Sequence, residues 1–211
     1  MKEFSVGMAL VDFIPVVLFA AASVILMRDL YNKMSKGAFA LLAAGTIDVA
    51  FAGALKALYK LLYAAGVCDF TPLSDMFFPV QSIGFLLAGV GMIAMLCHKQ
   101  KETPFAAAAP VVFKGTFIFV GCMVVGFGLM NAVLSVLSKK LRKGWLAVFF
   151  VLAWVCMLAM GYLSTRDFTQ ASMNWIAQGV NILGQGSFLL GTLLAHKAGL
   201  AKLLLREGET V

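Results

Sequence analysis

The last apolar segment of the chain, residues 173–195, reads MNWIAQGVNILGQGSFLLGTLLA. Its carboxamides recur at intervals of four, three and four residues, at Asn174, Gln178, Asn181 and Gln185. This spacing puts all four side chains on one face of a single helix, over about three turns. Unpaired amides are unfavourable in hydrocarbon, so we expect this face to point toward other helices or a wet cavity. Interhelical hydrogen bonding and a ligand-lining role are both compatible with the pattern.

The rest of the chain is also strongly apolar. Of its 211 residues, 62% are hydrophobic and only 13% are charged, and the mean hydropathy is +0.94. Ordinary soluble domains are far more polar than this. Apolar runs of ~20 residues, enough to cross a ~30 Å hydrocarbon core, follow one another with short breaks. We therefore expect an all-helical, multi-pass protein of the cell membrane, with a single transmembrane domain over residues 1–211.

Six segments are long enough to be membrane-spanning helices. They cover residues 6–30, 37–66, 76–97, 116–138, 144–164 and 173–195. Residues 104–113 are expected to form an interfacial or partly inserted lead-in to the fourth helix. Pro110 and Lys114 leave no clean run of about 17 residues before that helix, so length favours six crossings.

Charge and an internal repeat favour seven crossings instead. The matching pairs are FLLAG at 85–89 with FLLG at 188–191, His-Lys at 98–99 with 196–197, and Lys-Gly at 36–37 with 143–144. They predict two related halves, residues 6–98 and 114–197, in a three-plus-three or three-plus-one-plus-three order. If residues 104–138 crossed twice, nearly every loop Lys and Arg would be cytoplasmic. With six crossings, the basic run at 139–143 would lie outside.

Charged side chains also occur within the first two predicted helices. Asp48 lies near the middle of the second, where a carboxylate must be protonated, paired or wet, and is therefore a functional candidate. Lys56 and Lys60 lie one turn apart and could extend to lipid headgroups. If the two helices form an antiparallel hairpin, Asp12 lies at the same depth as these lysines and pairs with at least one of them.

Several kinds of site are missing from the sequence. The chain has two histidines and no HExxH, GxSxG or phosphate-binding loop, so no metal, cofactor or catalytic residue is expected. The four cysteines have no metal-binding spacing and are interpreted as packing residues. The net charge of +7 lies mostly between the apolar segments. It suits a lipid bilayer as partner, and no nucleic acid is expected.

The function that this pattern favours is transport or binding of a small polar or zwitterionic solute in a polar cavity between helices. The candidate substrate-binding residues are Asn174, Gln178, Asn181, Gln185, Gln81, Asp48, Lys56, Asp12 and Lys60. In the seven-crossing arrangement most of them lie toward the outer leaflet and could line one cavity. A homo-oligomer or a partner transporter subunit is compatible with this function. The alternative is a membrane sensor or scaffold protein with a structural polar core, and a lipid-modifying enzyme is the least favoured class.

Overall fold

The computed structural model describes residues 5–97, 116–164 and 171–205, and all their regular structure is helical. The elements are α1 (Val6–Val11), α2 (Phe13–Leu30), η1 (Tyr31–Lys33), α3 (Lys36–Ala65), α4 (Pro72–Asp75), α5 (Phe77–Cys97), α6 (Thr116–Lys140), η2 (Gly144–Leu146), α7 (Ala147–Leu163), α8 (Ala171–Lys197) and η3 (Leu200–Lys202). The predicted all-helical class is confirmed, and the long helices follow the predicted segments closely.

Among the residues that the structure describes, five helical stretches are long and apolar enough to cross a membrane. They are Val6–Lys33, Lys36–Ala65, Pro72–Cys97, Ile118–Lys140 and Gly144–Leu163. Helix α8 has similar length, but its amides make it the least apolar of the long helices. The set is compatible with a helical membrane protein.

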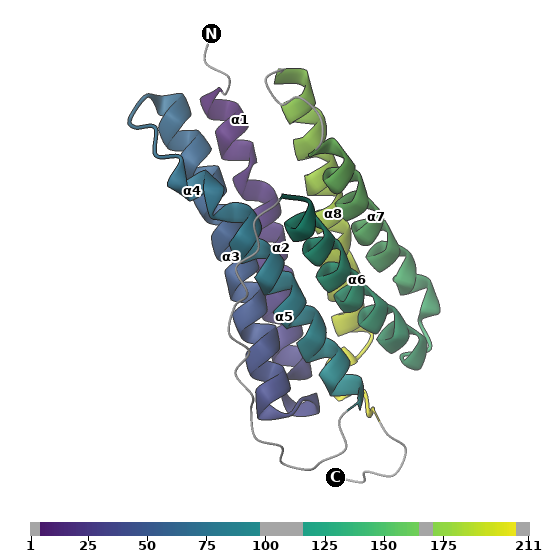
Figure 1. The fold of residues 1–211 in the computed structure, drawn as a ribbon. Helices are drawn as coiled ribbons and strands as arrows, with labels where there is room; N and C mark the ends of the chain where they lie inside the picture. Colours follow the sequence, from purple (N-terminus) through teal and green to yellow (C-terminus); the bar gives the residue numbers. More distant parts are fainter. Residues whose placement is uncertain (1–4, 98–115, 165–170, 206–211) are drawn as a thin grey trace.

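The long helices form a ring in which each packs against the next along the chain (Figure 1). Helix α2 packs on α3, α3 on α5, α5 on α6, α6 on α7 and α7 on α8, and α8 closes the ring against α2. Small residues allow the closest approaches. A β-carbon on Gly45 would collide with the backbone of α5 at Gly84, and one on Gly126 would collide with the backbone of Phe85. Close helix contacts of this kind are typical of membrane bundles.

Two of the six interfaces in the ring join parallel helices. Gly126 of α6 lies against Phe85 of α5, and Leu129 of α6 lies near Gly89 of α5. Residue numbers rise in the same direction along both helices, so α5 and α6 are parallel. Helices α2 and α8 are also parallel, because Asp12, just before α2, contacts Gln178, and the later residue Phe19 contacts the later residue Phe188. Since α5 and α6 run in the same direction, the end of α5 and the start of α6 point toward opposite ends of the bundle (Figure 1).

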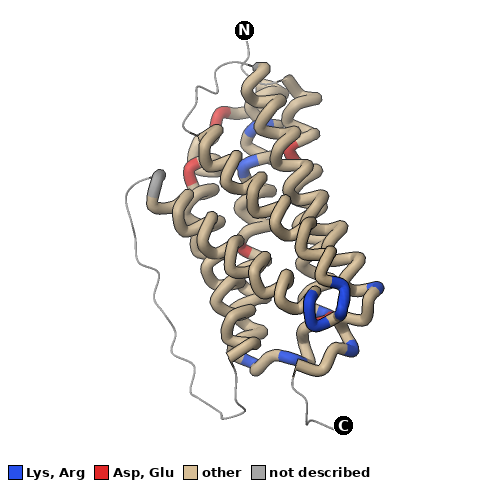
Figure 2. Tube along the Cα trace, turned by 90° about the vertical axis from the view of Figure 1, so that its right-hand side faces the viewer, with Lys and Arg blue, Asp and Glu red and all other residues tan. Residues whose placement is uncertain are grey.

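Basic residues gather at one end of the bundle (Figure 2). Lys33 and Lys140 both reach main-chain oxygens of the segment after α8 at this end. The alternation expected for six crossings would put the run at 139–143 at the opposite end from Lys33. The structure instead places both at the same end of the bundle. The proposed lead-in at 104–113, Pro110 and Lys114 lie outside the described residues.

Candidate functional site

A cavity of about 390 Å³ lies within the ring, in the half away from the basic end. Residues of α2, α3, α5, α6, α7 and α8 line it, together with Asp12 and Ser74. Its walls are largely apolar, and its polar lining residues are Asp12, Lys56, Tyr59, Lys60, Ser74, Gln81, Ser164, Asn174, Gln178, Asn181 and Gln185. A concave, mostly apolar site with a few converging polar groups is the usual form of a small-molecule site.

Eight of the nine candidate residues from the sequence line this one cavity. They are Asp12, Lys56, Lys60, Gln81, Asn174, Gln178, Asn181 and Gln185. The inward orientation predicted for the amide face of α8 is confirmed, because Asn174 and Gln178 are 3% and 4% exposed and both line the cavity.

Gln178 has a structural role as well as a place in the cavity wall. Its Nε2 donates one hydrogen bond of 2.8 Å to Met8 O and another of 2.8 Å to Asp12 Oδ1. These bonds join α8 to α1 and to the residue between α1 and α2. Because both acceptors require an N–H donor, the amide orientation is fixed, and Oε1 is the atom left without a partner.

Asp12 lies at the junction between α1 and α2. Pro15, three residues later, has no N–H to donate to Val11 O, which explains why the helix breaks at this point. The Asp12 carboxylate accepts an ion pair of 2.6 Å from Lys60 Nζ. The pairing expected from an antiparallel hairpin of the first two segments is therefore confirmed for Lys60.

Lys56 has a different environment from Lys60. Its ammonium lies 3.8 Å from the ring centre of Phe77 and 5.3 Å from that of Phe78, which is cation–π geometry. Within the described residues no ion pair of Lys56 is found. Both rings belong to the first turn of α5 and also line the cavity.

Asp48 is the one candidate residue that does not line this cavity. Its β-carbon faces Gly84 of α5, and Asp48 is absent from the cavity lining. At 100° per residue, Asp48 lies about 80° around α3 from Lys56, whereas Val49 lies about 20° from it. Val49 therefore occupies the cavity face that Asp48 was expected to occupy.

Four phenylalanine rings close the cavity toward the basic end. Phe19 stacks on Phe188 at 5.9 Å, Phe188 contacts Phe127 at 5.2 Å, Phe127 contacts Phe85 at 5.0 Å, and Phe85 contacts Phe19 at 5.7 Å. All four are 3% exposed or less. Three of them lie one helical turn beyond a cavity-lining residue: Phe85 after Gln81, Phe127 after Met123 and Phe188 after Gln185. We call this set the phenylalanine layer.

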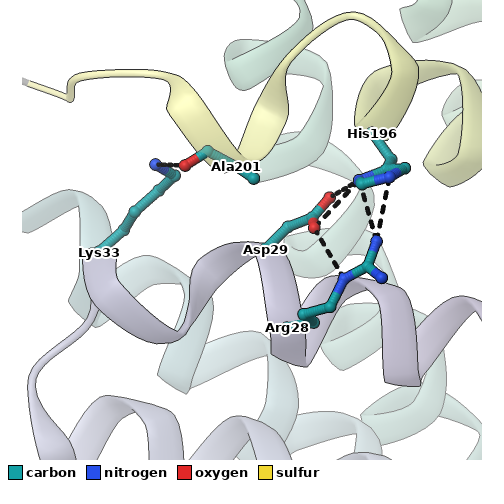
Figure 3. A network of polar contacts seen from close by, with 5 residues as sticks. All are labelled: Arg28, Asp29, Lys33, His196 and Ala201. Carbon is teal, nitrogen blue, oxygen red and sulfur yellow. Dashed lines mark hydrogen bonds and ion pairs between the residues drawn. The ribbon is translucent and has the colours of Figure 1, made fainter.

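A polar network lies beyond the phenylalanine layer, at the basic end (Figure 3). His196 Nδ1 is 2.8 Å from Asp29 Oδ2, and Arg28 donates to His196 Nε2 at 3.0 Å. Arginine can only donate, so this geometry fits an imidazole with its proton on Nδ1, directed to Asp29. The Asp29 side chain is 1% exposed. The network ties the end of α2 to the end of α8.

The sequence analysis missed several of these residues. Asp29 and His196 are far apart in sequence and share no motif, and only the equal direction of α2 and α8 joins them. Tyr59, Ser74 and Ser164 also line the cavity. Tyr59 could have been found, because it lies three residues after Lys56 on the same side of a helix. The other His-Lys pair, at 98–99, lies outside the described residues.

No group of three His, Cys, Asp or Glu side chains that could hold a metal ion is found in residues 5–97, 116–164 and 171–205. The cavity therefore offers hydrogen bonds, one ion pair and one cation–π-bound ammonium to a ligand. Comparison of the chain with protein-family models, with curated proteins and with solved structures gives no match.

Proposed function

We propose that this protein binds a small polar or zwitterionic solute in the cavity and carries it across the cell membrane. The observation that carries the proposal is the convergence of eight polar side chains from α3, α5, α8 and the α1–α2 junction on one space. Three of them, Gln81, Gln178 and Gln185, present buried carbonyl oxygens without a hydrogen-bond partner in the described residues. Buried acceptors without donors are unfavourable, so a donor from a bound solute would satisfy them.

The distribution of charge supports an orientation for the proposed carrier. Lys and Arg are retained on the cytoplasmic side of membrane proteins. The basic end would then face the cytoplasm, and the cavity would lie in the outer half of the bundle. With α5 and α6 parallel, the two ends of the connection between them would lie on opposite membrane faces, which favours seven crossings over six.

The two halves of the ring support a carrier built from repeats. Helices α2, α3 and α5 run in the same order of directions as α6, α7 and α8, and the halves meet at two parallel interfaces. Phe85 and Phe188, from the matching FLLAG and FLLG segments, both belong to the phenylalanine layer. Carriers with related halves bind their solute between them and open alternately to either side.

A solute screen tests binding in the cavity. Purified protein is heated with single solutes, and those that raise the unfolding temperature are tested on Asn181→Ala and Gln185→Ala. Both variants should lose the response, because both side chains line the cavity. Asn131→Ala is the matched control. Asn131 is 3% exposed, its Nδ2 donates a hydrogen bond to Phe127 O, and it does not line the cavity.

If every stabilising solute acts equally on Asn181→Ala and Gln185→Ala, the cavity is not a solute site. The polar lining would then be structural, as in the sensor or scaffold alternative. For solutes that pass this test, uptake into proteoliposomes separates a carrier from a receptor, since a receptor binds without accumulation.

Labelling of single cysteines tests the orientation. Cys68 is exposed in the connection between α3 and α4, and Lys143 is exposed at the basic end. With the other cysteines replaced by serine, Cys68 should react with a membrane-impermeant maleimide in intact cells. A Lys143→Cys variant should react only after permeabilisation. Reaction of both in intact cells would support the six-crossing order instead.

A further inference from the structure

The cavity carries an uncompensated positive charge. Three of its lining side chains are Asp or Lys, namely Asp12, Lys56 and Lys60. The Asp12 carboxylate and the Lys60 ammonium form an ion pair of 2.6 Å, so their formal charges cancel. This leaves the ammonium of Lys56, which faces aromatic rings and has no carboxylate partner among the described residues. A charge in a largely apolar site favours a ligand of opposite sign.

The orientation of the cavity amides defines a second requirement. Gln178 uses both N–H groups on Met8 O and Asp12 Oδ1, so only its carbonyl oxygen remains for a ligand. The carbonyl oxygens of Gln81 and Gln185 are likewise buried and unpaired. These oxygens accept hydrogen bonds and cannot donate, so they select ligands that carry an N–H or O–H group.

The depth and lining of the cavity define a third requirement. Lys56 and Val49 both line it and are seven residues apart on α3, which corresponds to about 10 Å of helix. Gln178 and Gln185 give the same depth along α8. Between these levels the walls include Met157 and Met160 of α7, and Phe19 of the phenylalanine layer lies at the deep end of the cavity. Flexible methionine and aromatic walls suit an apolar body of several carbon atoms.

We propose that the solute is an organic acid with an apolar body and an amine or hydroxyl group, such as an apolar amino acid. Its carboxylate pairs with Lys56 Nζ, its N–H or O–H group donates to an amide oxygen of Gln178 or Gln81, and its body fills the space above the phenylalanine layer. This inference rests on the proposed function and narrows its ligand class.

Three probes that differ by one group test this assignment by titration calorimetry on the full chain in lipid nanodiscs. L-Phenylalanine carries all three features, 2-phenylethylamine lacks the carboxylate, and 3-phenylpropionate lacks the amine. L-Phenylalanine should bind at one saturable site. Loss of the carboxylate should weaken binding by about 10- to 100-fold, the range for a charged hydrogen bond. Loss of the amine should also weaken it, by about 10-fold or more, because the ammonium donates a charge-assisted hydrogen bond to an amide oxygen.

The variant Lys56→Met keeps an unbranched side chain, one atom shorter than that of lysine, and removes its charge. It should abolish the preference for L-phenylalanine over 2-phenylethylamine while melting no lower than the wild type. Lys139→Met is the matched control, since Lys139 is an exposed residue at the basic end, and it should keep the preference.

Equal binding of L-phenylalanine and 2-phenylethylamine, or an unchanged preference in Lys56→Met, would overturn the acid class and leave solute binding in the cavity intact. Absence of binding by all three probes would also overturn the acid class as defined here. Failure of the proposed function has a different signature. In that case every solute that raises the unfolding temperature, whatever its charge, does so equally in the wild type, Asn181→Ala and Gln185→Ala.

Discussion

Replacing Gln178 and Asn181 in turn separates the structural part of the amide row from its ligand-facing part. Gln178→Met and Asn181→Leu each remove an amide at nearly constant volume, one turn apart on α8. Gln178 makes two hydrogen bonds of 2.8 Å, one to the main chain of α1 and one to a carboxylate. For Asn181, no hydrogen bond is found within the described residues, although it lines the cavity.

The expected magnitudes follow from these contacts. A neutral hydrogen bond contributes about 1 kcal/mol and a bond to a charged group about 2 kcal/mol. Removing the unpaired Gln178 Oε1 offsets about 1 kcal/mol of this loss. Gln178→Met should therefore lower the free energy of unfolding by about 2 kcal/mol. Asn181→Leu should leave that free energy unchanged or raise it, because a polar group that serves function need not serve stability.

Unfolding of the purified protein by sodium dodecyl sulfate in mixed micelles, followed by circular dichroism, measures both values. Leu183→Ala is the control for α8, since Leu183 is 54% exposed on the outer face of the bundle. A loss of about 2 kcal/mol in both amide variants would refute the reasoning. The whole row would then hold helices together, and the ligand-lining role would fall.

Three further predictions concern packing and the polar network. Gly126→Leu should prevent close packing of α5 and α6 and lower the yield of folded protein. Gly121→Leu should be tolerated, because no described atom lies within 4 Å of its β-carbon position. Size-exclusion chromatography compares the yields of folded protein for the two variants. Phe188→Ala should cost about 3–5 kcal/mol in detergent unfolding, since the ring is fully buried in the phenylalanine layer, and a loss below 1 kcal/mol would show that the layer is loosely packed. His196→Ala should cost about 1–2 kcal/mol, because the buried Asp29 carboxylate loses its imidazole partner but keeps the Arg28 guanidinium at 3.5 Å. The double variant His196→Ala/Asp29→Ala should lose less unfolding free energy than the sum of the losses in the two single variants. If the losses simply add, the two side chains are not coupled.

The helices of this fold could be predicted from the sequence because hydrocarbon imposes a strong rule on length and polarity. The predicted segments at 37–66 and 144–164 match α3 and η2–α7 within one residue at each end. The direction of α6 could not be fixed in the same way. Proline and lysine at 110 and 114 argued from length for one crossing, while the basic residues argued for two. The charge of any single loop is a weak signal, but the prediction made from charge agrees with the observed direction of α6.

The candidate site was predictable to the extent that polarity was rare. Amides are uncommon in the long described helices, and five of the six line one cavity together with Lys56 and Lys60. Asp48 shows the limit of this reasoning, since rarity identifies a residue but not the face of the helix it occupies. Counting 100° per residue puts Asp48 about 80° from Lys56, which does not exclude it, because Ala57 lies about 100° away and lines the cavity. The Asp29–His196 pair depends on helix packing between distant segments, which a single sequence does not encode locally.

Lys33 and Lys140 bind the segment after α8 through its main-chain oxygens at Ala201, Leu203 and Leu205, not through its side chains. Every residue type offers the same carbonyl group. These three hydrogen bonds therefore do not depend on the side chains that residues 201–205 carry, whereas the packing of Leu203 and Leu205 against the core does. Lys33 and Lys140, by contrast, donate through their ammonium groups, so an apolar residue at either position would lose these hydrogen bonds.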